Sequence, residues 1–414
     1  MRSGSKMTVR LRTTIVVIGV LLLSVFGSAE AFATPIPFLN QFNTIKVVSS
    51  TIPANGDVNP YGVFTIQRSV GKLVSGNVLV SNFNNSNNLQ GKGTTIVQIS
   101  PSGQQTLFAQ LNPAQLGGAC PGGVGLTTAL VVLKRGWVIV GSLPTADGTS
   151  ATAQAGCLIV LDSFGNPVET ISGGLINGPW DATVFDQENR VELFVSNVLN
   201  GTVAASPRVV NLGTVVRLSL QVPLQNVENQ HMNPFVGHPA MLPAAPQHRP
   251  QQPQNKQKQN LPKVVAETVI GTGFSERTDP AALVIGPTGL GLGLDGTLYV
   301  ADTVNNRIAA IPEALFRRTT AFSGLDVTAN GALNGPLGLS VAPNGDILTV
   351  NGGDGNIVET APDGNQIAVK QLDNTPVPGS PNGAGCLFGV QVSPFRNGVY
   401  FVDDCSNTLN ILTR

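Results

Sequence analysis

Hydrophobic and polar positions along this chain follow one recurring pattern. Each copy begins with a turn at a glycine or a polar residue. A short stretch with strand-like alternation follows and ends in a valine, after which comes a pair of small, amide or acidic residues. Alternation with a period of two predicts a β-strand rather than a helix. The clearest copy spans residues 296–302, and the others span residues 76–82, 136–142, 190–197, 345–351 and 398–404.

The spacing of these copies predicts a repeat architecture. The shared valine stands at Val80, Val140, Val195, Val300, Val350 and Val402, so most intervals are about 50 to 60 residues. A period of this size with strand-type alternation is typical of arrays and propellers. The long interval contains residues 225–262, which are dominated by glutamine, proline and asparagine. Such a segment buries too little apolar surface to offset the entropy of ordering it, which predicts a disordered insertion in the third repeat.

Further strand signals surround the shared strand in each repeat, with an inner strand before it and two strands after it. The fourth strand of the fourth repeat is weak and is expected near residues 319–322. The last repeat reaches Arg414 without a fourth strand, while an unassigned strand at residues 43–50 opens the series. If that strand completes the last sheet, the ring closes and leaves no open edge between its ends. The sequence therefore predicts an all-β, six-bladed β-propeller of four-stranded blades, closed by the N-terminal strand.

Two repeats resemble the unit of the NHL-repeat propellers. Residues 286–308 follow that unit closely, and residues 334–346 follow its first half. The other four repeats are divergent, so the resemblance covers about a quarter of the chain. It implies the propeller fold but leaves the activity open, because propellers with this repeat include enzymes and binding scaffolds.

The first 33 residues have the pattern of a secretory signal peptide. Arg2, Lys6, Arg10 and Arg12 precede an apolar run, and small residues offer a cleavage site after Ala31 or Ala33. The alternative is a membrane anchor, but the apolar run at residues 15–26 is short against the roughly 20 residues that span a bilayer. We therefore expect a secreted or periplasmic protein, with residues 34–414 as one propeller domain and no membrane contact after cleavage.

Composition narrows the partners that the protein could have. The chain has 24 Lys+Arg and 24 Asp+Glu, and only 12% of its 414 residues are charged. Loss of the leader removes four bases and one acid, which leaves 20 against 23, or a net charge of −3. This balance excludes an electrostatic nucleic-acid binder. We expect a monomer that binds a protein or a small molecule.

Four cysteines in an exported chain predict two disulfides, for which three pairings exist. Cys120 precedes an inner strand and Cys157 follows the next loop of the same repeat, and Cys386 and Cys405 occupy the same two places in the last repeat. These loops emerge on one face of a propeller, which favours Cys120–Cys157 and Cys386–Cys405. The alternative is four unpaired buried thiols.

Candidate catalytic chemistry is sparse. All three histidines, His231, His238 and His248, fall in the insertion, and no hydrolase, protease or phosphate-binding motif occurs. Virginiamycin B lyase, a propeller enzyme, depends on a histidine that cannot be placed here. The sequence therefore does not decide between a binding protein and an enzyme, and no catalytic residue is predicted.

One constellation of oxygen-bearing side chains could hold a hard cation. The shared strand of each repeat ends in one such residue, and the set is Asn82, Ser142, Asn197, Asp302, Asn351 and Asp404. Calcium prefers such ligands, and the six-bladed gluconolactonase-like hydrolases are similar in placing carboxylate and Asn oxygens around an axial metal. The alternative is that each side chain caps a turn through backbone N–H groups.

The start of an inner strand supplies the remaining candidates. Trp180 and Asp181 open the inner strand of the third repeat, and Tyr61 opens that of the first, which should bring all three toward the central channel. The leading functional hypothesis is an exported scaffold that binds a protein or small ligand at its loop-rich face through these residues and the ring. The alternative is a calcium-dependent lactonase or lyase. No other cofactor is expected.

Overall fold

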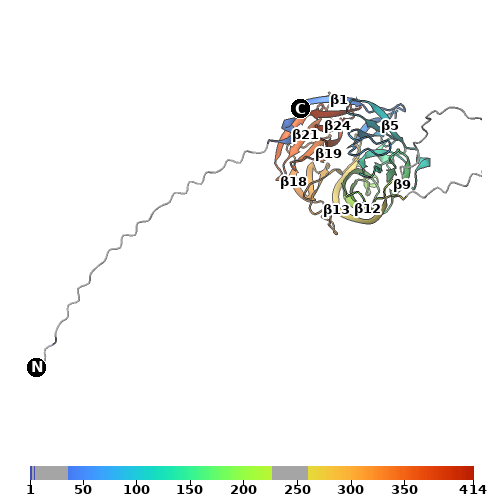
Figure 1. Ribbon diagram of the computed structural model, residues 1–414. Helices are drawn as coiled ribbons and strands as arrows, with labels where there is room; N and C mark the ends of the chain where they lie inside the picture. The colour runs from blue at the N-terminus through green and yellow to red at the C-terminus, as the bar shows by residue number, and fades with distance from the viewer. Residues whose placement is uncertain (2–3, 5–35, 226–259) are drawn as a thin grey trace, which may run out of the picture. The chain divides into compact units, whose positions relative to one another are not determined.

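Six antiparallel sheets follow one another around a ring in the computed structural model (Figure 1). The structure describes residues 36–225 and 260–414, together with Met1 and Gly4. The predicted leader and residues 226–259 of the predicted insertion, with all three histidines, lie outside the described residues. Pro37–Arg414 form one unit, and the description below concerns that unit.

Each blade begins with its inner strand at the axis and ends with its outer strand at the rim. The first three blades are built from β2 (Val58–Thr65), β3 (Val78–Asn84), β4 (Thr95–Ile99) and β5 (Gln105–Gln110); β6 (Leu126–Val132), β7 (Val138–Ser142), β8 (Cys157–Leu161) and β9 (Pro167–Ser172); and β10 (Pro179–Asp186), β11 (Arg190–Asn197), β12 (Val210–Gln221), β13 (Lys263–Asp279) and β14 (Leu283–Ile285).

The last three blades follow the same plan. They consist of β15 (Pro287–Leu292), β16 (Leu298–Asp302), β17 (Arg307–Ile311) and β18 (Leu325–Ala329); β19 (Pro336–Val341), β20 (Ile347–Asn351), β21 (Asn356–Thr360) and β22 (Gln366–Gln371); and β23 (Leu387–Val392), β24 (Val399–Asp403), β25 (Thr408–Thr413) and β1 (Thr44–Ser50). The chain thus forms an all-β, six-bladed propeller, as the repeat predicts.

Ring closure follows the predicted route. β1 pairs antiparallel with β25, so the N-terminal strand is the outer strand of the last blade. A hydrophobic cluster that joins Val63 and Val80 of the first blade to Tyr400 and Val402 of the last completes the closure. No sheet edge is therefore left open between the two ends of the chain.

The hydrophobic core lies between neighbouring blades. Along β16, Leu298 and Val300 pack toward blade three, whereas Tyr299 and Ala301 pack toward blade five. Both faces of the strand are therefore buried, although the side chains alternate in direction. Five of the six second strands are buried along their whole length for this reason.

Two parts of the fold differ from the sequence prediction. The fourth strand of blade four is β18, at Leu325–Ala329, and not at residues 319–322. Those residues lie in a loop, where Phe322 has a φ of 53° and its carbonyl accepts a hydrogen bond from the Thr272 N–H at 2.9 Å. Blade three carries an additional short strand, β14, which continues from β13 and pairs with its end.

Helical structure is confined to single turns in the described residues. These are the α-helix α1 (Thr202–Ala205) and the 3₁₀ turns η1 (Phe38–Gln41), η2 (Pro113–Gln115) and η3 (Ser150–Thr152). No described helix has the length and apolar character that a membrane crossing needs.

Candidate functional site

The predicted oxygen ring lies at the ends of the second strands. In five blades the strand's last residue pairs with the first residue of the inner strand, as in Pro287 with Asp302 and Pro336 with Asn351. In the first blade Asn82 lies two residues before the end of β3 and pairs with Pro60. In the last blade Leu387 pairs with Asp403. Asp403, and not the predicted Asp404, is therefore the equivalent residue. Five of the six equivalent residues have no exposed surface and Asp403 is 5% exposed, the set being Asn82, Ser142, Asn197, Asp302, Asn351 and Asp403.

Hydrogen bonds tie these side chains to a loop of their own blade or to the segment that leads into it. The Asp302 Oδ2 accepts from the Asn305 Nδ2 at 2.9 Å and from the Arg307 Nε at 2.8 Å. The Asn351 Nδ2 donates to the Ala332 carbonyl at 2.9 Å. Ser142, Asn82 and Asn197 likewise bond to loop residues. These bonds are typical of turn capping, whereas the Oδ1 atoms of Asn82, Asp302 and Asn351 are buried without a hydrogen-bond partner among the described residues.

Apolar side chains fill the axis at the end where the inner strands begin. On each inner strand one residue pairs with the ring residue, and the residue after it is large in four blades. These four residues, Tyr61, Trp180, Leu337 and Phe388, form one buried cluster. The Tyr61 ring stacks on Phe388 with 4.0 Å between centroids. We call this cluster, together with Phe83 and the strap residues 282–285, the axial seal. Leu283 of the strap is 1% exposed and has a φ of 62°.

The axial seal brings some of the predicted residues together but removes them from solvent. Tyr61 and Trp180 are only 2% and 3% exposed, with 6.5 Å between their ring centroids. The Tyr61 hydroxyl has no hydrogen-bond partner in the described residues. Burial raises the pKa of Tyr61 well above its ordinary value, and the nearby Asp404 and Asp279 carboxylates add to the rise. Burial also raises the pKa of Asp404 to about 8, with a further contribution from Asp403.

Asp181 occupies the next position of its inner strand, where four blades have glycine. The equivalent residues are Gly62, Gly289, Gly338 and Gly389. A Cβ on Gly338 would lie 2.0 Å from the Phe388 carbonyl oxygen of the next blade, so glycine lets neighbouring inner strands approach closely. Asp181 instead bridges to the next blade, because its Oδ2 accepts the Leu290 N–H at 2.8 Å.

An axial cavity of about 220 Å³ lies beside Asp181, on the other side of the axial seal. All six inner strands contribute to its wall, which combines apolar Leu290, Leu339 and Val390 with polar Thr183, Ser340 and Gln391. A neighbouring pocket shares Thr183 and Gln391 with it and extends to the exposed Arg68 and Lys134. The axial cavity therefore communicates with the face where the inner strands end, opposite the axial seal.

The environment of Asp181 favours proton exchange near neutral pH. Burial raises the pKa of its carboxyl to about 7, and the N–H groups of Leu290 and Ala182 oppose that rise by stabilising the anion. Ionised and neutral forms therefore coexist at pH 7.

The polar residues Thr183, Ser340 and Gln391 carried no recognisable sequence signal, since only the ring geometry shows that they share one cavity.

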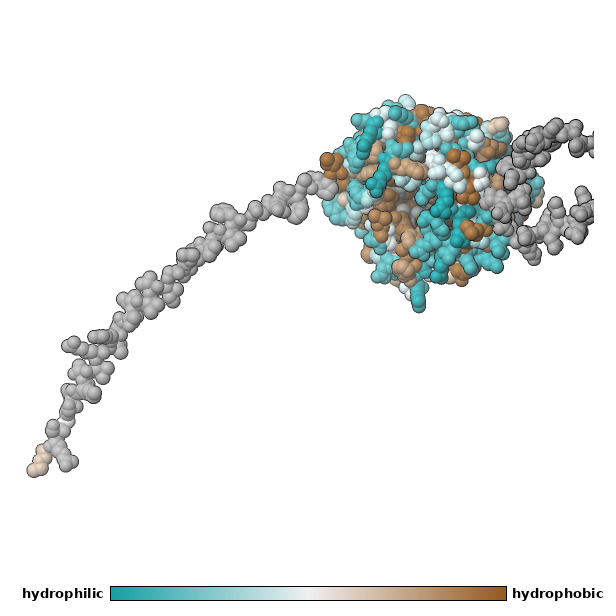
Figure 2. All heavy atoms as spheres, in the orientation of Figure 1, coloured by the Kyte–Doolittle hydropathy of each residue, from teal (hydrophilic) through white to brown (hydrophobic). Residues whose placement is uncertain are grey.

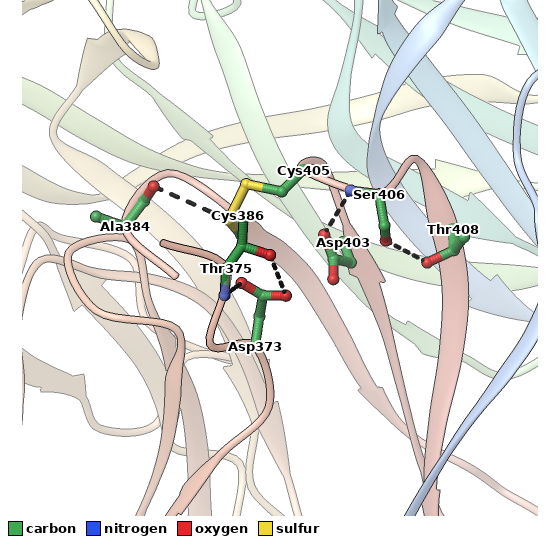
Figure 3. The surroundings of a disulfide bond; sticks show 8 residues. All are labelled: Asp373, Thr375, Ala384, Cys386, Asp403, Cys405, Ser406 and Thr408. Carbon is green, nitrogen blue, oxygen red and sulfur yellow. Dashed lines mark hydrogen bonds between the residues drawn. A yellow bond between two sulfur atoms is a disulfide. The ribbon is translucent and has the colours of Figure 1, made fainter. Parts of the chain in front are cut away.

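Both predicted disulfides form. Cys120 is bonded to Cys157 and Cys386 to Cys405. Figure 3 shows Asp373 and Asp403 beside the second bond, where Thr375 donates to Asp373 and the Ser406 N–H donates to Asp403 at 3.0 Å. Although Asp373 lies close to Cys386 and Cys405, the oxidised sulfurs provide no thiolate for a metal.

Two further acids are buried away from the axis, and the sequence analysis did not single them out. The Glu276 Oε1 accepts from the Thr202 hydroxyl at 2.9 Å, and burial raises the pKa of Glu276 to about 8. The Glu359 carboxylate accepts the N–H groups of Phe38 and Leu39 and so anchors the segment before β1. Both contacts stabilise the fold, and neither acid lines the axial cavity.

Comparisons with known proteins identify the fold class and go no further. No known protein-family profile and no curated protein matches the chain. Among solved structures, a luciferin-regenerating enzyme is 9% identical, with 90% of this chain and 95% of that chain covered and a TM-score of 0.50.

Two further solved structures have similar coverage. A calcium-binding protein, regucalcin, from Agrobacterium tumefaciens is 13% identical over 88% of this chain and 93% of its own, with a TM-score of 0.49. A gluconolactonase from Xanthomonas campestris is 12% identical over 89% of this chain and 88% of its own, with a TM-score of 0.48. The luciferin-regenerating structure supports the fold alone, because at 9% identity no activity can be transferred. The NHL resemblance stays a prediction.

Proposed function

We propose that this propeller binds a small polar molecule in the axial cavity, with Asp181 as its principal contact. The observation that carries this proposal is the replacement of a repeated glycine by one ionisable side chain, at the wall of a cavity that reaches solvent. A buried carboxyl with a raised pKa in such a place is a candidate functional group on physical grounds. Exceptions to a repeated structural pattern also tend to mark functional positions.

The geometry gives less support to a scaffold that binds through its loop-rich face. Tyr61 and Trp180 would have to be accessible there, but both are packed in the axial seal. On the face drawn in Figure 2, hydrophilic and hydrophobic residues are interspersed. That face therefore offers no broad apolar docking surface, and we infer a monomer. The two disulfides support export to an oxidising compartment.

An enzyme that uses acid–base chemistry is the second candidate. The regucalcin, gluconolactonase and luciferin-regenerating structures share the fold at identities too low to transfer an activity. The observation that favours catalysis lies in this chain, since a carboxyl with a pKa of about 7 is suited to accept and return a proton at neutral pH. For lactone hydrolysis, Asp181 would take a proton from the attacking water and return it to the departing alkoxide.

The calcium-dependent form of this second candidate does not fit the residues present. The ring side chains bond to neighbouring loops, and they stand on second strands, which the inner strands separate from the axis. Calcium needs about six to eight oxygen ligands, and the wall of the axial cavity contains one carboxylate. We therefore derive no catalytic step through a metal.

Methyl NMR spectroscopy would test the proposed site. Mixtures of small polar metabolites are titrated into protein with labelled Leu and Val methyl groups. At least one mixture should shift the signals of Leu290, Leu339 and Val390, leave those of Leu283 and Val284 in the axial seal unchanged, and bind less tightly to Asp181→Asn. Shifts confined to the axial seal, or none with any mixture, would overturn the proposal.

The enzyme candidate needs its own assay. Lactones are incubated with the wild type and with Asp181→Asn, and acid release is followed. A catalytic Asp181 predicts a loss of at least about 100-fold in the variant, the lower range for removal of a general base. Equal rates in both proteins would exclude Asp181 as the base.

A further inference from the structure

The axial cavity has a single formal charge on its wall. Asp181 is the one ionisable side chain among the described residues that line it. The nearest charged groups along the opening are Arg68, Lys134 and Asp186, in the neighbouring pocket. Lys134 is engaged with Asp186, whose carbonyl accepts from its Nζ at 2.7 Å, and Arg68 pairs with Glu188 at 3.4 Å. Arg68 therefore has an acidic partner, whereas the Lys134 ammonium is held by a backbone carbonyl.

Asp181 has no cationic partner within the described part of the chain. Its stabilising contacts are backbone N–H groups, and the pKa of its carboxyl is raised because burial disfavours the anion. Asp181 is partly buried. A carboxylate that is partly removed from water and has no counter-charge is disfavoured, and a cation beside it recovers part of that cost. A ligand that supplies the missing positive charge would thus be favoured over a neutral ligand of equal size.

We propose that the axial cavity selects small organic cations, in which a primary ammonium group pairs with Asp181 and a short apolar chain lies against Leu290, Leu339 and Val390. This inference rests on the proposed function. A divalent metal fits less well, because one carboxylate oxygen already accepts the Leu290 N–H and no second carboxylate is within reach on the wall. The volume of about 220 Å³ accommodates a short-chain ammonium ion, and the neighbouring pocket extends this space toward solvent.

The ionisation of Asp181 adds a pH signature to this selection. With a pKa of about 7, its ionised fraction rises about tenfold between pH 6 and pH 8. A primary ammonium ligand stays protonated over this range. Its affinity should therefore rise with pH, whereas the affinity of a neutral ligand should not.

Three four-carbon probes provide the test: n-butylammonium, butan-1-ol and butanoate. Their dissociation constants are measured by methyl NMR at pH 6 and pH 8 with the wild type, with Asp181→Asn and with Asp404→Asn as a matched control outside the cavity. Butylammonium should bind at least tenfold more tightly than butan-1-ol at pH 8, and butanoate more weakly than both. Asp181→Asn should remove that preference, and Asp404→Asn should retain it.

The outcomes separate the two proposals. Butan-1-ol or butanoate binding at the cavity methyls as tightly as butylammonium would overturn the cation class and leave the cavity as the site. Binding of no probe at the cavity methyls, together with no metabolite binding there, would overturn both. If Asp181→Asn does not fold, a butylammonium affinity in the wild type that stays constant from pH 6 to pH 8 would still overturn the cation class.

Discussion

The two ends of the propeller axis are built from the same six strands and have opposite characters. Where the inner strands begin, Tyr61, Trp180, Leu337 and Phe388 meet the strap residues 282–285 and leave no exposed aromatic surface. Beyond the glycine positions, smaller and polar side chains leave the axial cavity beside Asp181. The size of the side chain at successive inner-strand positions therefore decides which end stabilises the ring and which end can receive a ligand.

Loss of an aromatic side chain from the axial seal should have the largest effect on stability. Phe388→Ala removes a ring that is 2% exposed and stacks on Tyr61, and burial of this kind is worth about 3–5 kcal/mol. Phe395→Ala is the matched control, because Phe395 belongs to the same blade and is 50% exposed. Urea denaturation followed by tryptophan fluorescence should show a much lower midpoint for Phe388→Ala alone. Equal midpoints would mean that the axial seal contributes little to stability.

Removal of either disulfide should have the second-largest effect on stability. Each closes a loop, over sequence separations of 37 and 19 residues, and restriction of the unfolded chain is worth about 3–4 kcal/mol for loops of this length. Replacement of both cysteines of a pair by serine should lower the denaturation midpoint, slightly more for Cys120–Cys157 than for Cys386–Cys405. A larger loss from the shorter loop would show that local contacts outweigh loop length.

Most of the fold could be predicted from the sequence, because the residues that define the blades form a local pattern that repeats along the chain. Valines at a spacing of about 50 residues identify the blades, and the alternation along β16 reflects packing against two neighbours. The orphan strand β1 and the incomplete last blade predict ring closure. The strap could not be predicted, because residues 282–285 occur once and belong to no repeat, so periodicity carries no information about them.

The candidate site was less accessible to sequence reasoning because side-chain direction is a tertiary property. The residue types of Asp302 and Asn351 suit both a metal and a turn, and only their hydrogen bonds to Arg307 and to the Ala332 carbonyl distinguish the two roles. In the last blade two consecutive acids left the register open, and strand pairing selects Asp403. Proximity of Asp181 to the axis could be expected, whereas the side from which a ligand reaches it depends on residues from all six blades.

Asp181 should make the stability of the protein depend on pH. Its pKa of about 7 in the folded protein exceeds the usual value near 4, so the folded state holds the proton more tightly. That stabilisation is complete below about pH 4 and is lost as the pH rises through 7. Between low and high pH, the wild type should lose about 1–2 kcal/mol of unfolding free energy relative to Asp181→Asn. This loss is smaller than a carboxyl fully excluded from water would give, because the axial cavity reaches solvent.

Unfolding free energies at pH 4.5 and pH 8 would measure this dependence. The difference between the wild type and Asp181→Asn should shrink or change sign toward the higher pH. Parallel pH profiles for the two proteins would indicate that Asp181 has an ordinary pKa, and the acid–base candidate would then lose its main support.

Calcium should have the smallest effect of all, and this prediction tests the turn-capping interpretation of the oxygen ring. A site with a dissociation constant 100-fold below the calcium concentration would stabilise the folded protein by about 2.7 kcal/mol, which a thermal melt detects easily. Because the Asp302 Oδ2 already accepts from Asn305 and Arg307, we expect a melting temperature that changes by less than about 1 °C between EDTA and millimolar calcium. A saturable increase of several degrees that Asp302→Asn abolishes would contradict this interpretation. The oxygen ring would then be a candidate calcium site, and the candidate functional site would lie at the end of the axis that the axial seal closes rather than at the open end.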